Sequence, residues 1–258
     1  MPHVTDLLPN QILSQNEGPV AKVVNPEGRA AICLVCEHAS PVIPSSLGSL
    51  GLADADRESH AAWDPGAGDL ARHLSCSLDA PLVMARVSRL VYDCNRPPER
   101  PDAMPARTET IDIPGNRNLS PEERAARTRE IYDVFHQTLA DTLDGFPKPP
   151  ALVTIHSFTP FWFDTPRPTE IGLLHDADDR LARTMLKSAT SEFRTDLNQP
   201  YSTADGVTHL LARHGTARAL NNVMIEVRND LLRDDHSIER IANTLQSMIT
   251  AALGELAK

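Results

Sequence analysis

Short apolar runs alternate with amphipathic stretches along the chain, and this alternation predicts an α/β fold. The apolar runs are continuous, which is typical of strands buried on both faces. They predict strands at residues 31–37, 81–87, 89–93, 151–158, 170–174 and 223–227. Apolar positions three and four apart predict helices at residues 64–77, 120–145, 178–189 and 237–256. This order indicates a three-layer α/β/α domain with a mixed, mainly parallel central sheet.

One predicted helix start carries a specific motif. In Ser120-Pro121-Glu122-Glu123, Ser120 is the N-cap, Pro121 takes the first helical position and Glu123 completes a capping box. Residues 95–118, just before this motif, are rich in Pro and Arg and have no period. We expect them to form a long ordered loop, of a length and composition that would suit a lid over a site.

The size and composition fit one globular domain over residues 1–258. Hydrophobic residues make up 41% of the chain and charged residues 23%, which suffices for a core and excludes wholesale disorder. Residues 1–28 lack clear periodicity, so we expect them to lie over the surface. The formal charge of −10 makes nucleic acids and anionic membranes poor partners. No apolar stretch approaches the roughly 20 residues that span a bilayer, and no oligomeric state is indicated.

The four cysteines do not make a disulfide framework in a chain of this size. Cys33 and Cys36 lie in a predicted strand, where side chains three apart point to opposite faces. We therefore interpret them as buried structural thiols. The N-terminus has no basic segment followed by an apolar run, so we see no secretory signal and expect a cytoplasmic protein.

Three predicted strands end in a side chain suited to catalysis. His38 follows the first strand, His156 lies near the end of another, and Glu226 lies in the last. Burying such groups costs free energy unless they are paired or bound to a metal. The carboxyl ends of parallel strands meet at one edge of a sheet, so the three could converge there. Two imidazoles and one carboxylate suit a catalytic zinc site, and another carboxylate can act as general base.

Asp64 and Glu37 are the two candidates for the carboxylate ligand. Asp64 stands at a predicted helix start, whereas Glu37 adjoins His38, and neighbours on a strand point to opposite faces. We favour Asp64 and keep Glu37 as the second choice. The spacing matches no H-E-x-x-H motif, and the nitrogen and oxygen ligands would suit zinc but also manganese, iron or cobalt.

Arginines frame a further candidate site around residues 88–97. Arg89 and Arg96 are suited to binding a carboxylate with two hydrogen bonds, although ordinary ion pairing with nearby aspartates is the alternative. Ser40 and Ser157 lie near the two histidines and leave a serine hydrolase open, although no G-x-S-x-G motif occurs. The absence of G-x-G-x-x-G and Walker A motifs disfavours a nucleotide enzyme.

Five short motifs occur in order between about residues 31 and 231. They are Cys36-Glu37-His38-Ala39-Ser40, Trp63-Asp64-Pro65-Gly66-Ala67, Ser88-Arg89-Leu90-Val91-Tyr92-Asp93-Cys94-Asn95-Arg96-Pro97, Ile155-His156-Ser157-Phe158 and Ile225-Glu226-Val227-Arg228-Asn229-Asp230-Leu231. Together they resemble the N-formylglutamate amidohydrolase family, which is similar in fold to zinc-dependent carboxypeptidases and aspartoacylases.

The resemblance implies hydrolysis of the amide of a small N-acyl acidic amino acid. N-formyl-L-glutamate and water would give formate and L-glutamate, a step of histidine catabolism. On the matching positions, the resemblance implies one Zn²⁺ ion held by His38, Asp64 and His156, with Glu226 as the base. We expect Arg89 to be catalytic with Glu226, by stabilising the oxyanion, and the contacts with the substrate to come from Asn95, Arg96, Ser157 and Arg228.

The first motif departs from the pattern of the histidine-pathway members, which tend to have Pro before the first motif His and Ala-Gly or Ser-Gly after it. Here the motif reads Glu37-His38-Ala39-Ser40, so the acyl group or the amino acid could differ. An amidase or carboxypeptidase for another N-acyl amino acid, a peptide or a peptidoglycan fragment is the first alternative. A metal-free serine hydrolase and a non-catalytic metabolite-binding protein are the others.

Overall fold

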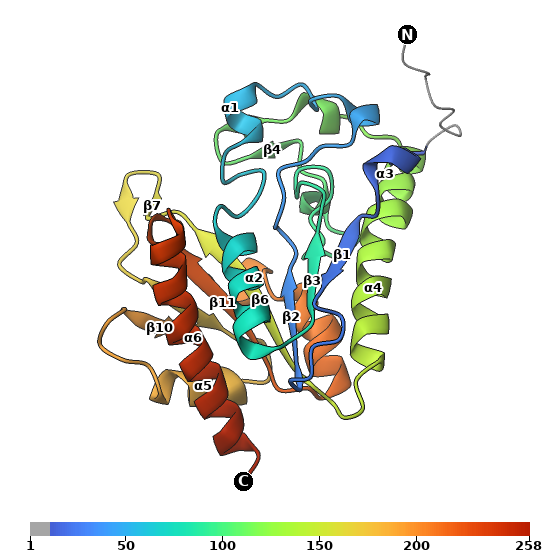
Figure 1. The fold of residues 1–258 in the computed structure, drawn as a ribbon. Coiled ribbons are helices and arrows are strands. Elements are labelled where there is room, and N and C mark those ends of the chain that lie inside the picture. The colour runs from blue at the N-terminus through green and yellow to red at the C-terminus, as the bar shows by residue number, and fades with distance from the viewer. Residues whose placement is uncertain (1–10) are drawn as a thin grey trace.

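A seven-stranded mixed sheet runs through the computed structural model, which describes residues 11–258 (Figure 1). In spatial order its strands are β1 (Ala21–Val24), β3 (Leu82–Ala85), β2 (Ile32–Cys36), β6 (Ala151–Phe158), β11 (Asn222–Arg228), β9 (Ile171–Leu174) and β10 (Thr195–Leu197). β3, β2, β6 and β11 pair in parallel, whereas β1 and β9 run antiparallel to β3 and β11. The predicted mixed, mainly parallel sheet is confirmed.

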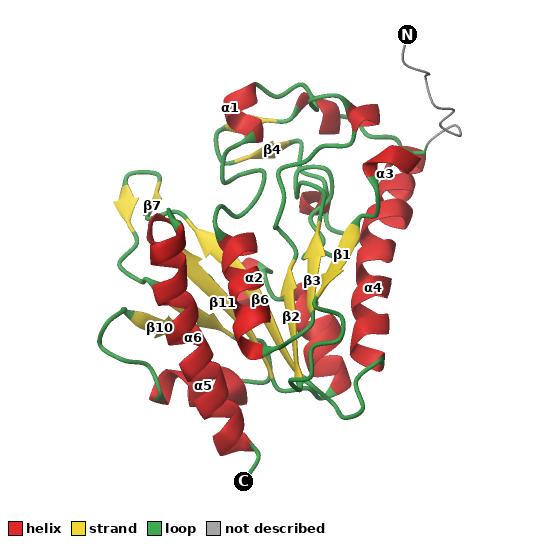
Figure 2. Ribbon diagram, viewed as in Figure 1, coloured by secondary structure: helices red, strands yellow, loops and turns green. Residues whose placement is uncertain are grey.

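Helices cover both faces of the sheet (Figure 2). One face packs against α2 (Ala67–Leu78), α5 (Arg180–Lys187) and α6 (Asp235–Leu256). The other packs against α4 (Asp133–Asp144) and the π-helical turn Leu211–Gly215. The shorter elements are α1 (Asp54–Arg57), α3 (Pro121–Arg127) and the two-stranded hairpins β4 (Arg107–Thr108) with β5 (Ile111–Asp112), and β7 (Phe161–Trp162) with β8 (Thr165–Pro166). Both hairpins lie beyond the carboxyl ends of the central strands, so they can frame a site there (Figure 1).

The strands divide their apolar side chains between the two layers. In β2, Cys33 and Val35 join the core under α4, and Leu34 and Cys36 join the core under α2 and α6. This alternation is the period of two that a strand imposes. Both cysteines are buried and free, on opposite faces of the sheet, as their spacing predicts.

Apart from α1 and the two small hairpins, which were not predicted, the sequence-based prediction is wrong at three short segments. It misses β10 and also β1, which lies inside the predicted surface segment; residues 1–10 of that segment lie outside the described residues. Strands of three or four residues at a sheet edge give too short a pattern to detect. Residues 89–93, predicted as a strand, form tight turns because Val91 N donates to Ser88 O and the Ser88 hydroxyl accepts from Leu90 N.

The predicted capping box is present at the start of α3. The Ser120 hydroxyl accepts from Glu123 N at 3.2 Å, and the Glu123 carboxylate accepts from Ser120 N at 2.7 Å. The helix then continues through the π-helical turn Thr128–Tyr132 into α4. None of the helices within residues 11–258 combines the length and apolarity of a bilayer crossing.

The base of the predicted long loop at residues 95–118 is fixed by two buried side chains. Asn116 donates to Leu90 O at 2.8 Å and to Pro105 O at 2.9 Å. Arg127 of α3 donates to Val91 O at 3.1 Å and to the Asn116 side-chain oxygen at 2.7 Å. The loop is therefore ordered, as predicted.

Candidate metal centre

Three segments bring His38, Asp64 and His156 together at the carboxyl edge of the sheet. His38 follows β2 and His156 lies in β6. The turn before α2 carries Asp64, whose backbone N–H donates to His38 O at 2.9 Å. Gly66 closes this turn with φ +79°, and a Cβ atom there would lie 2.4 Å from Leu232 Cβ. The turn therefore requires glycine, and it moves the start of α2 from the predicted residue 64 to Ala67.

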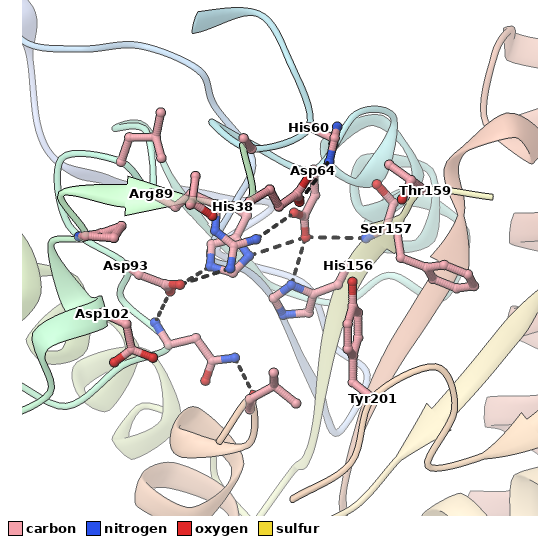
Figure 3. Close-up of a pocket in the computed structure, with 18 of the residues that line it drawn as sticks. His38, His60, Asp64, Arg89, Asp93, Asp102, His156, Ser157, Thr159 and Tyr201 are labelled. Atoms are coloured by element: carbon pink, nitrogen blue, oxygen red, sulfur yellow. Dashed lines mark hydrogen bonds and ion pairs between the residues drawn. The ribbon is translucent and has the colours of Figure 1, made fainter. Parts of the chain in front are cut away.

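The three side chains aim their polar atoms at one point (Figure 3). One oxygen of Asp64, Oδ2, lies 3.3 Å from His38 Nδ1 and 2.9 Å from His156 Nδ1. One ligand atom from each residue lies within 4.8 Å of the others, and all three residues are buried. Two nitrogens and one oxygen at this spacing fit a divalent cation of the zinc type with a position left open.

A carboxylate stands behind each imidazole. Asp93 Oδ1 lies 2.8 Å from His38 Nε2, and Glu37 Oε2 lies 3.1 Å from His156 Nε2. Asp93 is hydrogen-bonded to its imidazole, an arrangement that fixes the ring and the tautomer of metal-binding histidines, whereas Glu37 contacts His156 at ion-pair distance without hydrogen-bond geometry. Glu37, the second choice for the metal ligand, therefore lies behind His156, and Asp64 completes the group. The sequence suggested Asp93 only as an ion-pair partner of an arginine, and its contact with His38 was not predicted.

The electrostatics of the group favour a positive charge between its carboxylates. Burial and Arg89 lower the pKa of His38, but Asp93 and Asp64 outweigh them, so the pKa is raised. Burial lowers the pKa of His156, but Glu37 and Asp64 raise it well above the ordinary value. Both shifts favour the protonated imidazoles, and a bound cation would supply the positive charge in their place.

Glu226 stands next to this group in β11, in register with His156 of β6. Burial, with a smaller contribution from Asp64, raises the pKa of Glu226 to about 7. Its Oε2 is buried and has no hydrogen-bond partner among residues 11–258. Glu226 and the three candidate ligands line one cavity of about 320 Å³. A carboxyl group with a free oxygen and a pKa near neutrality is suited to proton transfer.

The predicted arginines reach the cavity but are already paired. Arg89 donates to Asp64 Oδ1 at 3.2 Å and to Asp93 Oδ2 at 2.9 Å. Arg96 donates to Asp102 at 3.2 Å and to Gly206 O at 2.8 Å. Both arginines therefore line the cavity and are also ion-paired with aspartates, so the two interpretations of the sequence hold together.

Asn95 also lines the cavity, and its side chain spans two backbone groups, donating to Val207 O and accepting from Leu210 N. The Ser157 backbone N–H donates to Asp64 Oδ2 at 3.3 Å, and the Ser157 hydroxyl donates to Pro65 O at 2.8 Å. Asn95 thus connects the motif at residues 88–97 to the chain at 207–210, and Ser157 connects β6 to Asp64.

Two predicted residues point elsewhere. Arg228 is bound to Asp230 at 2.7 Å and Glu170 at 3.4 Å, and it is not among the described residues that line the cavity. The Ser40 hydroxyl donates to Arg86 O at 3.0 Å and also lies outside the cavity lining. With the Ser157 hydroxyl on a carbonyl, neither serine is arranged as a nucleophile beside a histidine.

Aromatic side chains form a wall that sequence reasoning missed, namely Phe158, Trp162 and Tyr201. Tyr201 lies beside His156 at the cavity (Figure 3). Burial, and to a lesser extent the charge of Glu226, raise its pKa to about 12. The three lie at the end of β6, in β7 and in the loop after β10 and share no period, so only the tertiary structure shows that they meet.

A family model described as N-formylglutamate amidohydrolase matches residues 30–233 of the chain. Among solved structures, a gene product of Agrobacterium tumefaciens is 44% identical with a TM-score of 0.94, over 96% of this chain and 100% of its own. An N-formylglutamate amidohydrolase from Ralstonia eutropha JMP134 is 15% identical with a TM-score of 0.67, over 91% of this chain and 97% of its own, and it shows the shared fold. None of the curated proteins matches the chain significantly.

Proposed function

Because the chain belongs to the N-formylglutamate amidohydrolase family, we propose that it is a metal-dependent hydrolase of the amide bond in small N-acyl acidic amino acids. N-formyl-L-glutamate, which with water gives formate and L-glutamate, is the first substrate to test. One observation carries the proposal: His38, Asp64 and His156 converge in a cavity where a buried Glu226 oxygen has no described partner.

His38, Asp64 and His156 would hold the cation, for which Zn²⁺ is our first choice. When bound, such an ion polarises the amide carbonyl and makes water more acidic. Asp93 holds the His38 ring through a hydrogen bond, and Glu37 supplies a negative charge behind the His156 ring.

Glu226 takes a proton from the water that attacks the acyl carbon. It returns this proton to the amine nitrogen as the carbon–nitrogen bond breaks, so the carboxyl group ends as it began. Arg89 presents a fixed positive charge to the oxygen on which negative charge develops. Arg96 and Asn95, which also line the cavity, orient the carboxylate of the substrate.

The test is formate release from N-formyl-L-glutamate by protein of known metal content, before and after chelation. Release that stops on chelation and returns with zinc supports both the reaction and the metal. Activity that survives complete metal removal would refute the metal assignment. A metal-loaded protein that releases no formate would keep the metal site and exclude this substrate.

A further inference from the structure

Among residues 11–258, Arg167 beside the metal cavity has no carboxylate as ion-pair partner. Arg167 follows β8 and lines a groove of about 600 Å³ that shares Trp162 and Tyr201 with the metal cavity. Its guanidinium carbon lies 5.6, 4.9 and 5.0 Å from the ring centroids of Phe158, Trp162 and Tyr201. The three rings therefore hold the guanidinium in one place.

The charge of Arg167 is available to a ligand. Its Nη1 donates to two oxygens of Thr159 at 3.4 Å, which are long hydrogen bonds, and its other side-chain interaction is with the neutral Tyr201 hydroxyl. In the part of the chain that the structure describes, no carboxylate lies within ion-pair distance of it, whereas Arg89 and Arg96 are both ion-paired. Aromatic faces orient a guanidinium but do not satisfy the N–H donors in its plane.

We propose that Arg167, held by Trp162 and Tyr201, is a second substrate-binding subsite that takes a carboxylate beyond the scissile amide. The ligand class is an N-acyl acidic amino acid extended by a second acidic residue. This inference rests on the proposed function of the neighbouring cavity. The shared Trp162–Tyr201 wall makes cavity and groove neighbours, so one extended substrate reaches both. A planar carboxylate matches the fork of N–H donors on a guanidinium.

The experiment measures how strongly Arg167 and the distal carboxylate depend on each other. The substrates are N-formyl-L-glutamate extended by L-glutamate, through its α- or its γ-carboxyl, and the same compounds with both carboxyls of the second residue as amides. The preference is the kcat/KM ratio of acid to amide in the metal-loaded full chain. We expect at least about tenfold preference for the acid with one linkage in the wild type, and none in R167Q.

Arg240 provides a matched control, because it stacks on Phe193 at 5.5 Å and pairs with Glu192 far from the cavity. R240Q loses the same charge and should keep the wild-type preference. R167K keeps the charge but lacks the fork of N–H donors, so it should keep only part of the preference for the acid. If R167Q does not fold, this reduced preference in R167K is the test of the subsite. The subsite is overturned if R167Q keeps the wild-type preference for the acid over the amide. It is also overturned if the wild type turns over acid and amide equally well.

Failure of the proposed function gives a different result. If the wild type turns over none of these compounds, their dissociation constants, measured by calorimetry in wild type and R167Q, replace kcat/KM. Tighter binding of the acid that disappears in R167Q supports the subsite while the hydrolase proposal fails. Equal binding of acid and amide by the wild type overturns the subsite as well.

Discussion

Asp93 supports the metal centre without belonging to the candidate ligand group, and its replacement by Asn gives a sharp prediction. Its Oδ1 accepts from Asn95 N at 2.9 Å and lies 2.8 Å from His38 Nε2, and its Oδ2 accepts from Arg89 at 2.9 Å. Asn has the same shape but no charge. If its carbonyl keeps the His38 contact, its NH₂ group faces the Arg89 N–H, so two donors meet.

Loss of such an outer partner typically weakens metal binding about 10- to 100-fold. Because D93N also sets donor against donor at Arg89, we expect the upper end, near 100-fold, which is about 2.7 kcal/mol. The assay is competition for zinc between protein and a chromophoric chelator at fixed pH, with thermal unfolding to show that the variant is folded.

Asp102 offers the matched control, since it is more exposed and pairs with Arg96 and Arg100. D102N should leave zinc affinity within about threefold of wild type, because exposed ion pairs contribute little. A folded D93N protein that binds zinc as tightly as wild type would refute the supporting role of Asp93.

Three further predictions concern other parts of the molecule. E226Q should lower turnover by about 100-fold or more while metal content stays unchanged; undiminished formate release from the metal-loaded variant would remove Glu226 as the base. Because burial raises the pKa of Glu226 to about 7, its ionised form increases with pH, so kcat/KM should rise through neutrality, and a flat profile between pH 6 and 8 would contradict this. G172A should lower the free energy of unfolding by about 1–3 kcal/mol, since its Cβ would lie 1.9 Å from Gln199 O. G254A, in an open part of α6, should not destabilise the protein. Equal denaturation midpoints for the two variants would disprove the clash at Gly172.

The sequence predicted those parts of the molecule that depend on local pattern. The buried strands and the capping box at Ser120 were identified because apolar runs and side-chain caps act over a few residues. His38, His156 and Glu226 could be predicted as a group because each lies in or just after the carboxyl-terminal part of a central strand.

The aromatic wall of the cavity and the contacts of Asp93 and Glu37 with the histidines could not be predicted from local pattern. Tyr201, in the loop after β10, and Trp162, in β7, meet through the packing of separate segments, which leaves no period in the sequence. Glu37 was the second choice as a ligand because neighbours on a strand point to opposite faces. Its position behind His156 depends on a contact between two strands, which the sequence does not show. The pairing of Arg167 with rings instead of a carboxylate likewise depends on three separate segments.

The buried contacts of Arg127 make distant parts of the chain open together. This side chain joins α3 to Val91 and Asn116, and Asn116 joins both to Leu90 and Pro105, so none of these segments can detach without breaking the same hydrogen bonds. Asp93 lies inside this unit and contacts His38. Local unfolding of the loop should therefore loosen the metal centre, and by linkage a bound metal should suppress that unfolding. Protease cleavage between residues 97 and 112 should accordingly slow when zinc is added, although none of those residues is a candidate ligand.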